Sequence, residues 1–224
     1  MRLLATSLEA LLLGDALLAT APASPGSTSL AAICGWVLDR YGLTLAADSE
    51  DATVAEVDAT SWRPGTTAWD YLDPMLEAAS LRLWADERGT FRISARQQTV
   101  PGAVTITPTG TMKRLADTMS RDPEVWYDGV AIEYRWIDDF DLNRVEFDVA
   151  GPQPAKAVLP VLKDGVRYPG PGAAAGLLNR AQGRGRVLEL DAVSDYSVSP
   201  GMAATVTPPE TDSQTGYVSA GSWR

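Results

Sequence analysis

The stretch 66–94 constrains the fold most strongly, because its apolar residues change from helical to alternating spacing. Thr67, followed by Asp70 three positions later, forms a capping-box pattern that starts a helix. Apolar residues at every second position then flank the segment DERG, which indicates two strands. Gly89 ends that segment, and we expect it in the left-handed conformation of a tight turn. The stretch therefore predicts a helix lying on a two-stranded ribbon.

Pro74 interrupts the predicted helix and leaves two possibilities open. A proline inside a helix removes a hydrogen bond and costs about 3 kcal/mol or more. The helix either kinks at Pro74 or begins afresh there, with Asp73 as the cap of the new helix. In both cases the apolar face continues to Ala79.

The absence of histidine excludes several classes of catalytic site. A Ser–His–Asp arrangement cannot form within one chain, and a single cysteine cannot build a zinc site. Cys34 lies in an apolar helical pattern, which indicates a buried and unreactive thiol. The lysines, none of which lies in an apolar run, are predicted to be charged surface residues: Lys113, Lys156 and Lys163. We expect neither a metal ion nor a cofactor.

The formal net charge of -10 narrows the range of partners. A chain with this charge repels nucleic-acid phosphates and anionic lipid over most of its surface. No apolar run reaches the ~18 residues that a membrane span requires. We therefore expect a folded protein without a membrane span that does not bind DNA specifically.

The N-terminal segment resembles a secretory signal, but its charges argue against one. Arg2 precedes an apolar run, whereas Glu9 and Asp15 interrupt that run. Leucines at helical spacing over 4–12 favour a short packed helix. We expect the native protein to retain this segment, which mass spectrometry of the mature chain would show.

The rest of the chain is read mainly as short strands joined by polar turns. Helices are predicted at 29–41, 111–122 and 173–186; strands at 54–57, 102–110, 125–136, 143–149, 187–209 and 216–223; and an extended, proline-broken loop at 150–172. The strands 125–136 and 143–149 each carry an apolar stripe and are predicted to pair as a hairpin around IDDFDL.

These elements predict an α+β, β-dominated fold, with small β-barrel or hairpin domains and two or three short packed helices. Composition and turn signals suggest three regions. We expect an N-terminal helical and loop segment at 1–64, a helix with hairpins at 65–150, and a proline-rich loop with a C-terminal β-region at 151–224.

The order of these motifs resembles the tail-hub, or baseplate-hub-like, minor tail proteins of tailed phages. The likeness rests on the tryptophan-containing helix, LRLWADERGTFRIS, the later strand EVWYDGVAIEY and the element SDYSVSPGMAATVT. The chain departs from that pattern at three positions. Asp128 stands where asparagine is commoner, Pro74 breaks the usual helix, and Met202 stands where an acidic residue is commoner.

The resemblance implies a β-rich, ring-forming structural protein of the virion, without catalysis. In that family three copies typically join the sixfold tail tube to the tail tip and leave a channel for DNA. The implied partners are further copies of the chain, a distal tail or tail-tube protein, other tail-tip proteins and the passing genome. The helix and ribbon of 66–94 would then build part of the ring wall.

Two acidic groups are candidates for a channel wall that repels phosphate. They are the hairpin-tip acids Asp138, Asp139 and Asp141, and the loop acids Asp48, Glu50 and Asp51. The alternative for either group is a solubility charge on the outer surface. The test is DNA ejection from particles in which the tip acids are replaced by lysine.

Two other sequence patterns are only weak evidence for a functional site. Asp139, Asp141 and Asn143 have the spacing of the first ligands of a calcium loop, but later positions do not carry the residues that such a loop requires. Glu124 with the acids at 138–139 would supply the carboxylate pair of a glycosidase, although such pairs arise by chance in an acidic chain.

Two rival functions follow from these patterns. One is a carboxylate-dependent hydrolase of cell-wall glycans, which a cell-wall digestion assay would detect. The other is a receptor- or carbohydrate-binding tail module, supported only by the tryptophans. Trp36, Trp69 and Trp136 lie on apolar stripes and are predicted to belong to the core.

Overall fold

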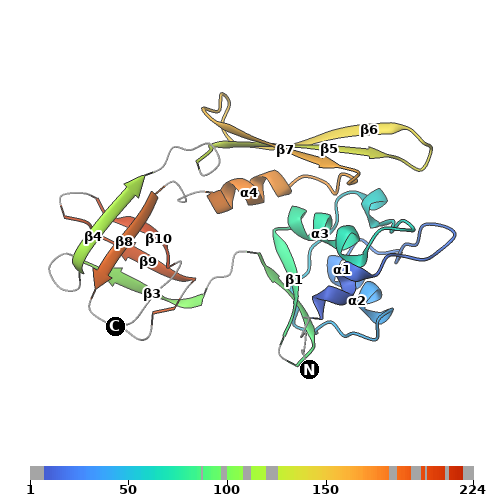
Figure 1. Cartoon of the computed structure of the whole chain (residues 1–224), viewed down its shortest axis with the longest axis horizontal. Helices are drawn as coiled ribbons and strands as arrows, with labels where there is room; N and C mark the ends of the chain where they lie inside the picture. The colour runs from blue at the N-terminus through green and yellow to red at the C-terminus, as the bar shows by residue number, and fades with distance from the viewer. Residues whose placement is uncertain are drawn as a thin grey trace, which may run out of the picture. The chain divides into compact units, whose positions relative to one another are not determined.

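The computed structural model describes residues 8–86, 88–96, 100–107, 112–119, 126–181, 186–192, 198–199, 201–209 and 212–218. The chain forms two compact units (Figure 1). Unit 1 combines Met1–Arg96 with Asp128–Asn179, and unit 2 combines Gln97–Tyr127 with Arg180–Arg224. Each unit is thus built from two separate parts of the sequence. The three-region division by composition remains a prediction about sequence segments.

The first part of unit 1 holds short helices and one hairpin. Its elements are α1 (Glu9–Gly14), α2 (Leu30–Asp39), the 3-10 helix η1 (Val57–Thr60), α3 (Ala68–Ala78), β1 (Leu81–Ala85) and β2 (Phe91–Ala95). One hydrophobic cluster joins them, and it includes Leu12, Leu72 and Phe91. Of the leucines predicted to pack, Leu12 is buried in this cluster and Leu8 packs against it, Leu11 is exposed, and Leu4 lies outside the described residues. The strand predicted at 54–57 is wrong, because η1 takes up its last residue and no strand precedes it there.

Side-chain caps fix the two longer helices of this unit. The hydroxyl of Ser29 accepts the Ala32 N–H at 3.1 Å, and that of Thr67 accepts the Asp70 N–H at 3.0 Å. The sequence predicted the cap at Thr67, whereas for the helix at 29–41 it left the cap open among Ser27, Thr28 and Ser29. Helix α3 continues through Pro74 as one element, so the alternative of a fresh helix capped by Asp73 is wrong.

The hairpin predicted for 81–94 is confirmed. Strands β1 and β2 pair antiparallel from Leu81 opposite Ala95 to Ala85 opposite Phe91. Gly89 has φ of +80°, the left-handed conformation that the turn requires. The hairpin places Leu83 and Phe91 in the core, which explains the alternating pattern of the sequence.

Trp62 is the buried tryptophan of this core, and the sequence stripes did not identify it. Its ring stacks on Tyr71 at 5.4 Å and meets Trp36 edge-on at 6.0 Å. Its indole N–H donates to the Thr66 carbonyl at 3.0 Å. The three tryptophans predicted to be core residues are only partly buried. Cys34 is buried as expected, and burial raises the pKa of its thiol to about 12.

The second part of unit 1 is a three-stranded sheet in the order β6-β5-β7. Its elements are β5 (Gly129–Ile137), β6 (Asn143–Ala150), β7 (Val158–Asp164) and the helix α4 (Ala173–Ala181), which runs below the sheet in Figure 1. The predicted hairpin of β5 and β6 is confirmed. The loop predicted across 150–172 is wrong at β7, which pairs parallel with β5 in spite of Pro160.

The two apolar stripes of this hairpin lie on opposite faces of the sheet. Val130, Ile132 and Tyr134 are buried on the face that we call the inner face. Residues that pair directly across two strands lie on the same face of a sheet. Val149 pairs with Ala131 and Phe147 pairs with Glu133, and these two β5 residues alternate with the buried ones. The stripe of β6 therefore points away from the core.

Asp148 attaches the inner face to α4. Its carboxylate accepts the backbone N–H groups of Gly172 at 3.1 Å and Ala174 at 2.8 Å, at the start of the helix. These N–H groups would otherwise lack partners, and the helix dipole favours a negative charge there. The buried charge of Asp148 is thus explained by the local fold.

Unit 2 contains two small sheets. Its strands are β3 (Val100–Ile106), β4 (Met112–Met119), β8 (Arg186–Ala192), β9 (Met202–Val206) and β10 (Gln214–Tyr217). One sheet has the order β10-β9-β3, and the other pairs β4 with β8. The helix predicted at 111–122 is wrong, because pairing with β8 turns 112–119 into a strand. The segment 112–119 has apolar residues at helical spacing, but pairing with a strand far along the chain determines its structure.

The predicted α+β, β-dominated class is confirmed. The strands of the described part form sheets of two or three strands and no closed barrel. In that same part, no helix reaches the length and hydropathy that crossing a membrane requires.

Candidate interaction surface

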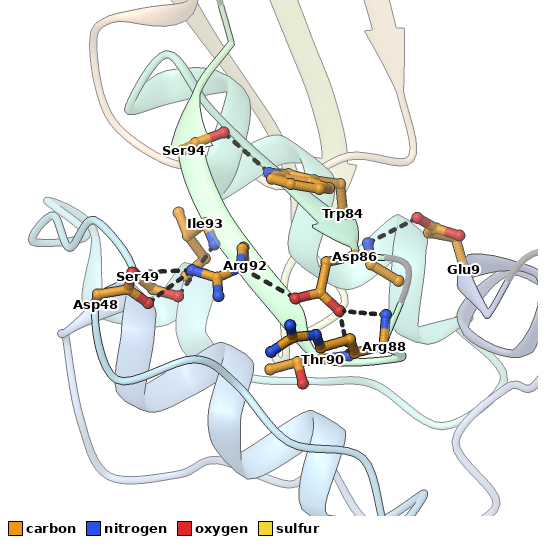
Figure 2. Close-up of polar contacts among 11 residues, drawn as sticks. Glu9, Asp48, Ser49, Trp84, Asp86, Arg88, Thr90, Arg92, Ile93 and Ser94 are labelled. Atoms are coloured by element: carbon orange, nitrogen blue, oxygen red, sulfur yellow. Dashed lines mark hydrogen bonds and ion pairs between the residues drawn. The ribbon is translucent and has the colours of Figure 1, made fainter.

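The candidate acid Asp48 belongs to an ion-pair network on the hairpin of β1 and β2 (Figure 2). The Arg92 guanidinium donates to both oxygens of Asp48 at 2.8 and 2.9 Å and contacts Asp86 at 3.3 Å. Asp86 also accepts the N–H groups of Arg88 and Thr90, each at 2.9 Å. The Thr90 N–H is the main cause of the lowered pKa of Asp86. This network holds the hairpin turn.

Glu50 and Asp51 also serve the local fold. Glu50 accepts the Ala95 N–H at 3.2 Å, which extends the contacts of β2. Asp51 accepts the Ala31 N–H and the Ser29 hydroxyl, each at 2.8 Å, at the start of α2. The Ala31 hydrogen bond is the main cause of the lowered pKa of Asp51.

At the tip of the hairpin of β5 and β6, Asp138 closes the turn. Its carboxylate accepts the N–H groups of Phe140 at 2.8 Å and Leu142 at 3.0 Å, and it pairs with Arg144 at 2.7 Å. The hydrogen bond from Leu142 contributes most to the lowered pKa of Asp138.

Asp139 joins the hairpin tip to the helical part of unit 1. It pairs with Arg167 at 2.6 Å and with Arg63 at 2.9 Å. These two arginines, Arg167 first, lower the pKa of Asp139. Asp141 adopts φ of +58° in the turn, and its side chain makes no hydrogen bond or ion pair within the described part of the chain.

The six candidate acids therefore remain two separate groups, and five of the six have local partners. Each of these five carboxylates accepts hydrogen bonds from an arginine or from the backbone or side chain of a neighbouring residue. Asp141 is the candidate whose charge is free to act on a passing ligand. Whether any of these acids faces a channel remains a prediction.

A cleft of about 540 Å³ lies between α3 and the segment that follows β7. Its lining includes Glu77, which accepts hydrogen bonds from Lys163 at 3.2 Å and Arg96 at 3.5 Å. Lys163 is thus half-buried and held in an ion pair. Tyr134 also lines the cleft, and burial raises the pKa of its hydroxyl. Two of the acids that line this cleft form ion pairs: Asp73 and Glu77 of α3 both pair with Arg96, which directly follows β2, and Glu77 also pairs with Lys163 of β7.

The other predicted sites gain no support from this geometry. Within the described residues, no group of three or more Asp, Glu or Cys side chains is placed to hold a metal ion. Asp139, the first residue of the calcium-loop pattern, is used by two arginines. Glu124 of the glycosidase pattern lies outside the described residues.

A group of exposed apolar residues of unit 1 lies on the side of the sheet that faces away from α4. We call this surface the outer face. Its apolar members are between 50% and 63% exposed: Ile137, Val145, Phe147, Val149, Val158 and Leu162. The sequence predicted the stripe on β6 but gave no sign that it would lack a covering element.

Comparison with known proteins identifies structural likeness alone. No protein-family profile matches the chain, and no curated protein matches it. The tail protein from Neisseria meningitidis MC58 has a TM-score of 0.50 and 13% sequence identity, over 92% of this chain and 64% of that protein. The 43 kDa tail protein of prophage MuSo2 from Shewanella oneidensis has a TM-score of 0.48 and 13% identity, over 91% and 63%. The chain thus spans under two thirds of either protein and has the fold of the Neisseria protein.

Proposed function

We propose that this chain is a structural protein of a phage tail and forms a ring-like hub at the tail tip. The observation that carries the proposal is the fold shared with the Neisseria tail protein over nearly the whole of this chain. A common fold does not fix function by itself. The motif order of the sequence and the exposed outer face point the same way.

The hub is a homotrimer in this proposal. Three copies surround the DNA channel and connect the tail tube, or a distal tail protein, to the other proteins of the tip. A closed ring of this kind needs a head-to-tail contact, in which two different patches of each subunit meet. We expect each subunit to bury on the order of 1,000 Å² or more against its neighbours.

Two features of the chain support a role in assembly over a role in catalysis. The outer face presents apolar side chains that an isolated protein would be expected to cover. Two carboxylates that line the cleft, Asp73 and Glu77, are held by Arg96 and Lys163, so this pair is not arranged as a free acid and base. The net charge of -10 suits a protein that lets DNA pass without holding it.

Purified virions test the proposal by copy number and place. We expect quantitative mass spectrometry to give three copies of the chain per tail, and antibody labelling to mark the tail tip. Absence from the virion would contradict the proposal. Release of sugar from cell walls by the purified chain, abolished by changing one Asp or Glu, would support the hydrolase instead.

A further inference from the structure

The outer face carries an unusual amount of exposed apolar surface for one small sheet. Its six apolar side chains expose roughly 500 Å², near the upper end of the largest patch on a typical monomer. An interface of ordinary size buries about 800 Å² on each partner. The outer face can therefore supply the greater part of one interface.

Charge on the outer face is mostly balanced within the face. Glu133 and Arg135 lie among the apolar residues and pair with each other at 2.6 Å, and the exposed Asp164, opposite Arg135 on β7, leaves one negative charge. The chain as a whole has a formal net charge of -10, so two copies repel over most of their surfaces. A nearly neutral apolar face is where two such copies can approach with the least repulsion, whereas a basic partner would be drawn to the acidic surface.

The backbone hydrogen-bonding groups of alternate β6 residues point to the free edge of the sheet. The Gly129 N–H donates to Ala157 at 3.0 Å, and the Gly165 N–H donates to Arg135 at 2.7 Å. These bonds show that the odd-numbered residues of β5 bond to β7, so its even-numbered residues bond to β6. The N–H and C=O groups of Val145, Phe147 and Val149 consequently point to the free edge of the sheet.

The two edge strands of this sheet, β6 and β7, differ in how they are protected against pairing with a further strand. Strand β6 pairs with β5 without a register shift and contains no proline. On β7 the alternation turns the nitrogen of Pro160 to the free edge, where it removes a donor. Natural proteins commonly blunt an edge in this way to prevent further strand pairing. The β6 edge has no such proline, although β6 carries the charged residues Arg144, Glu146 and Asp148 between its outer-face residues.

From these observations we propose that the outer face and the β6 edge bind a second copy of this chain. In the proposed hub, this surface is one of the two patches that meet in the head-to-tail interface of the ring. The inference rests on the proposed function only for that role in the ring. Phe147 is the central residue, because its side chain lies on the outer face and its backbone groups lie at the edge. Aromatic residues at the centre of an interface commonly dominate its affinity.

The test measures self-association of the full chain by sedimentation. We expect the wild-type protein to form an oligomer at micromolar concentration. The double variant Phe147→Lys, Val149→Lys should weaken association by about 30-fold or more, since two charges would be buried at the contact. The matched control is Leu18→Lys, Val57→Lys, which adds the same charge at residues that are 98% and 65% exposed elsewhere in unit 1.

A second variant separates the edge from the face. Val145→Pro removes an N–H that points to the free edge, so it leaves the ladder between β5 and β6 complete. It should weaken association, while circular dichroism and the thermal melt show that unit 1 still folds. Loss of folding in this variant would leave the lysine pair to decide.

The possible results test the self-association surface separately from the proposed hub. A monomeric wild type, or an oligomer that the lysine pair at 147 and 149 does not weaken, would overturn this inference. The hub itself would still be judged by the copy number in virions. A dimer dissolved by the same pair would support the outer face and count against the threefold ring.

Discussion

At the scale of single residues, Asp51 shows that an acid suited to a channel wall can instead hold a helix end. Its carboxylate accepts the Ala31 N–H and the Ser29 hydroxyl at the start of α2. We predict that Asp51→Ala lowers the free energy of unfolding by about 1 kcal/mol, the usual cost of losing a cap. Urea denaturation at pH 7 measures this. The exposed Asp141→Asn is the control and should change little, because asparagine also tolerates the φ of +58° at this position.

The contribution of Asp51 should also depend on pH. Its pKa in the folded state lies below the ordinary value of 3.8, chiefly because of the Ala31 hydrogen bond. A depressed folded pKa means that the stabilisation is complete above the unfolded pKa and is lost as the pH falls through the folded pKa. The difference in stability between the wild type and Asp51→Ala should therefore shrink below about pH 4. A constant difference down to pH 2 would contradict the capping role.

Lys163 provides a second residue-scale prediction, because it joins β7 to α3. Its ammonium group donates to the nearly buried carboxylate of Glu77 at 3.2 Å. Lys163→Met keeps the apolar stem and leaves Glu77 with Arg96 at 3.5 Å. We expect a loss of about 1.5–3 kcal/mol in the free energy of unfolding, typical of a hydrogen bond to a charged group. Lys156→Met, at an exposed lysine, is the matched control, and equal effects of the two would show that the ion pair contributes nothing.

At the scale of elements, Gly172 sets how closely α4 approaches the end of α3. A Cβ atom at this position would lie 2.2 Å from the Ala78 carbonyl oxygen, and the residue has φ of +136°. We predict that Gly172→Ala lowers the free energy of unfolding by about 3 kcal/mol or more, from the clash together with backbone strain. Thermal melts of the whole chain measure this loss.

Gly65→Ala separates strain from the clash. Gly65 has φ of +84°, and a Cβ atom there would meet nothing within 4 Å. It should cost only about 1–2 kcal/mol, the penalty of a left-handed residue without crowding. A similar loss in the two variants would refute the close approach of α4 and α3.

Elements whose local pattern agrees with their tertiary surroundings could be predicted from the sequence. The hairpin of β1 and β2 has alternating apolar residues and a turn glycine, and both signals act within a few positions. Strand β4 has helical spacing but finds its partner β8 far along the chain. Strand β7 contains Pro160, which is tolerated because its nitrogen faces the free edge. Long-range pairing of this kind leaves no local signal.

The candidate surface was predictable only in part, for a related reason. The sequence shows two apolar stripes on β5 and β6, but their spacing does not tell which face α4 covers. That depends on Asp148 binding the start of α4 from the inner face. Similarly, the acids at the hairpin tip could be found from composition, whereas their arginine partners Arg63 and Arg167 come from distant segments.

At the scale of the whole molecule, the acidic charge is predicted to ease the passage of DNA. Replacing Asp138 or Asp139 would also break their ion pairs with arginine, so Asp141 is the cleaner site. If Asp141 faces the channel, Asp141→Lys should slow DNA ejection from assembled particles, because three added cations per ring would attract phosphate. Each exposed charge reaches only about 8 Å at physiological salt. Unchanged ejection would reject the lumenal position and leave the hub itself intact.

The central claim is that copies of this chain form a threefold ring at the tail tip. Reconstruction of the assembled tail by electron microscopy, without imposed symmetry, tests it most directly. We predict three copies around the tail axis, with the outer face of each subunit buried against the next and a channel left open for DNA. A single copy on the axis, a twofold pair, or a position away from the tip would contradict the account.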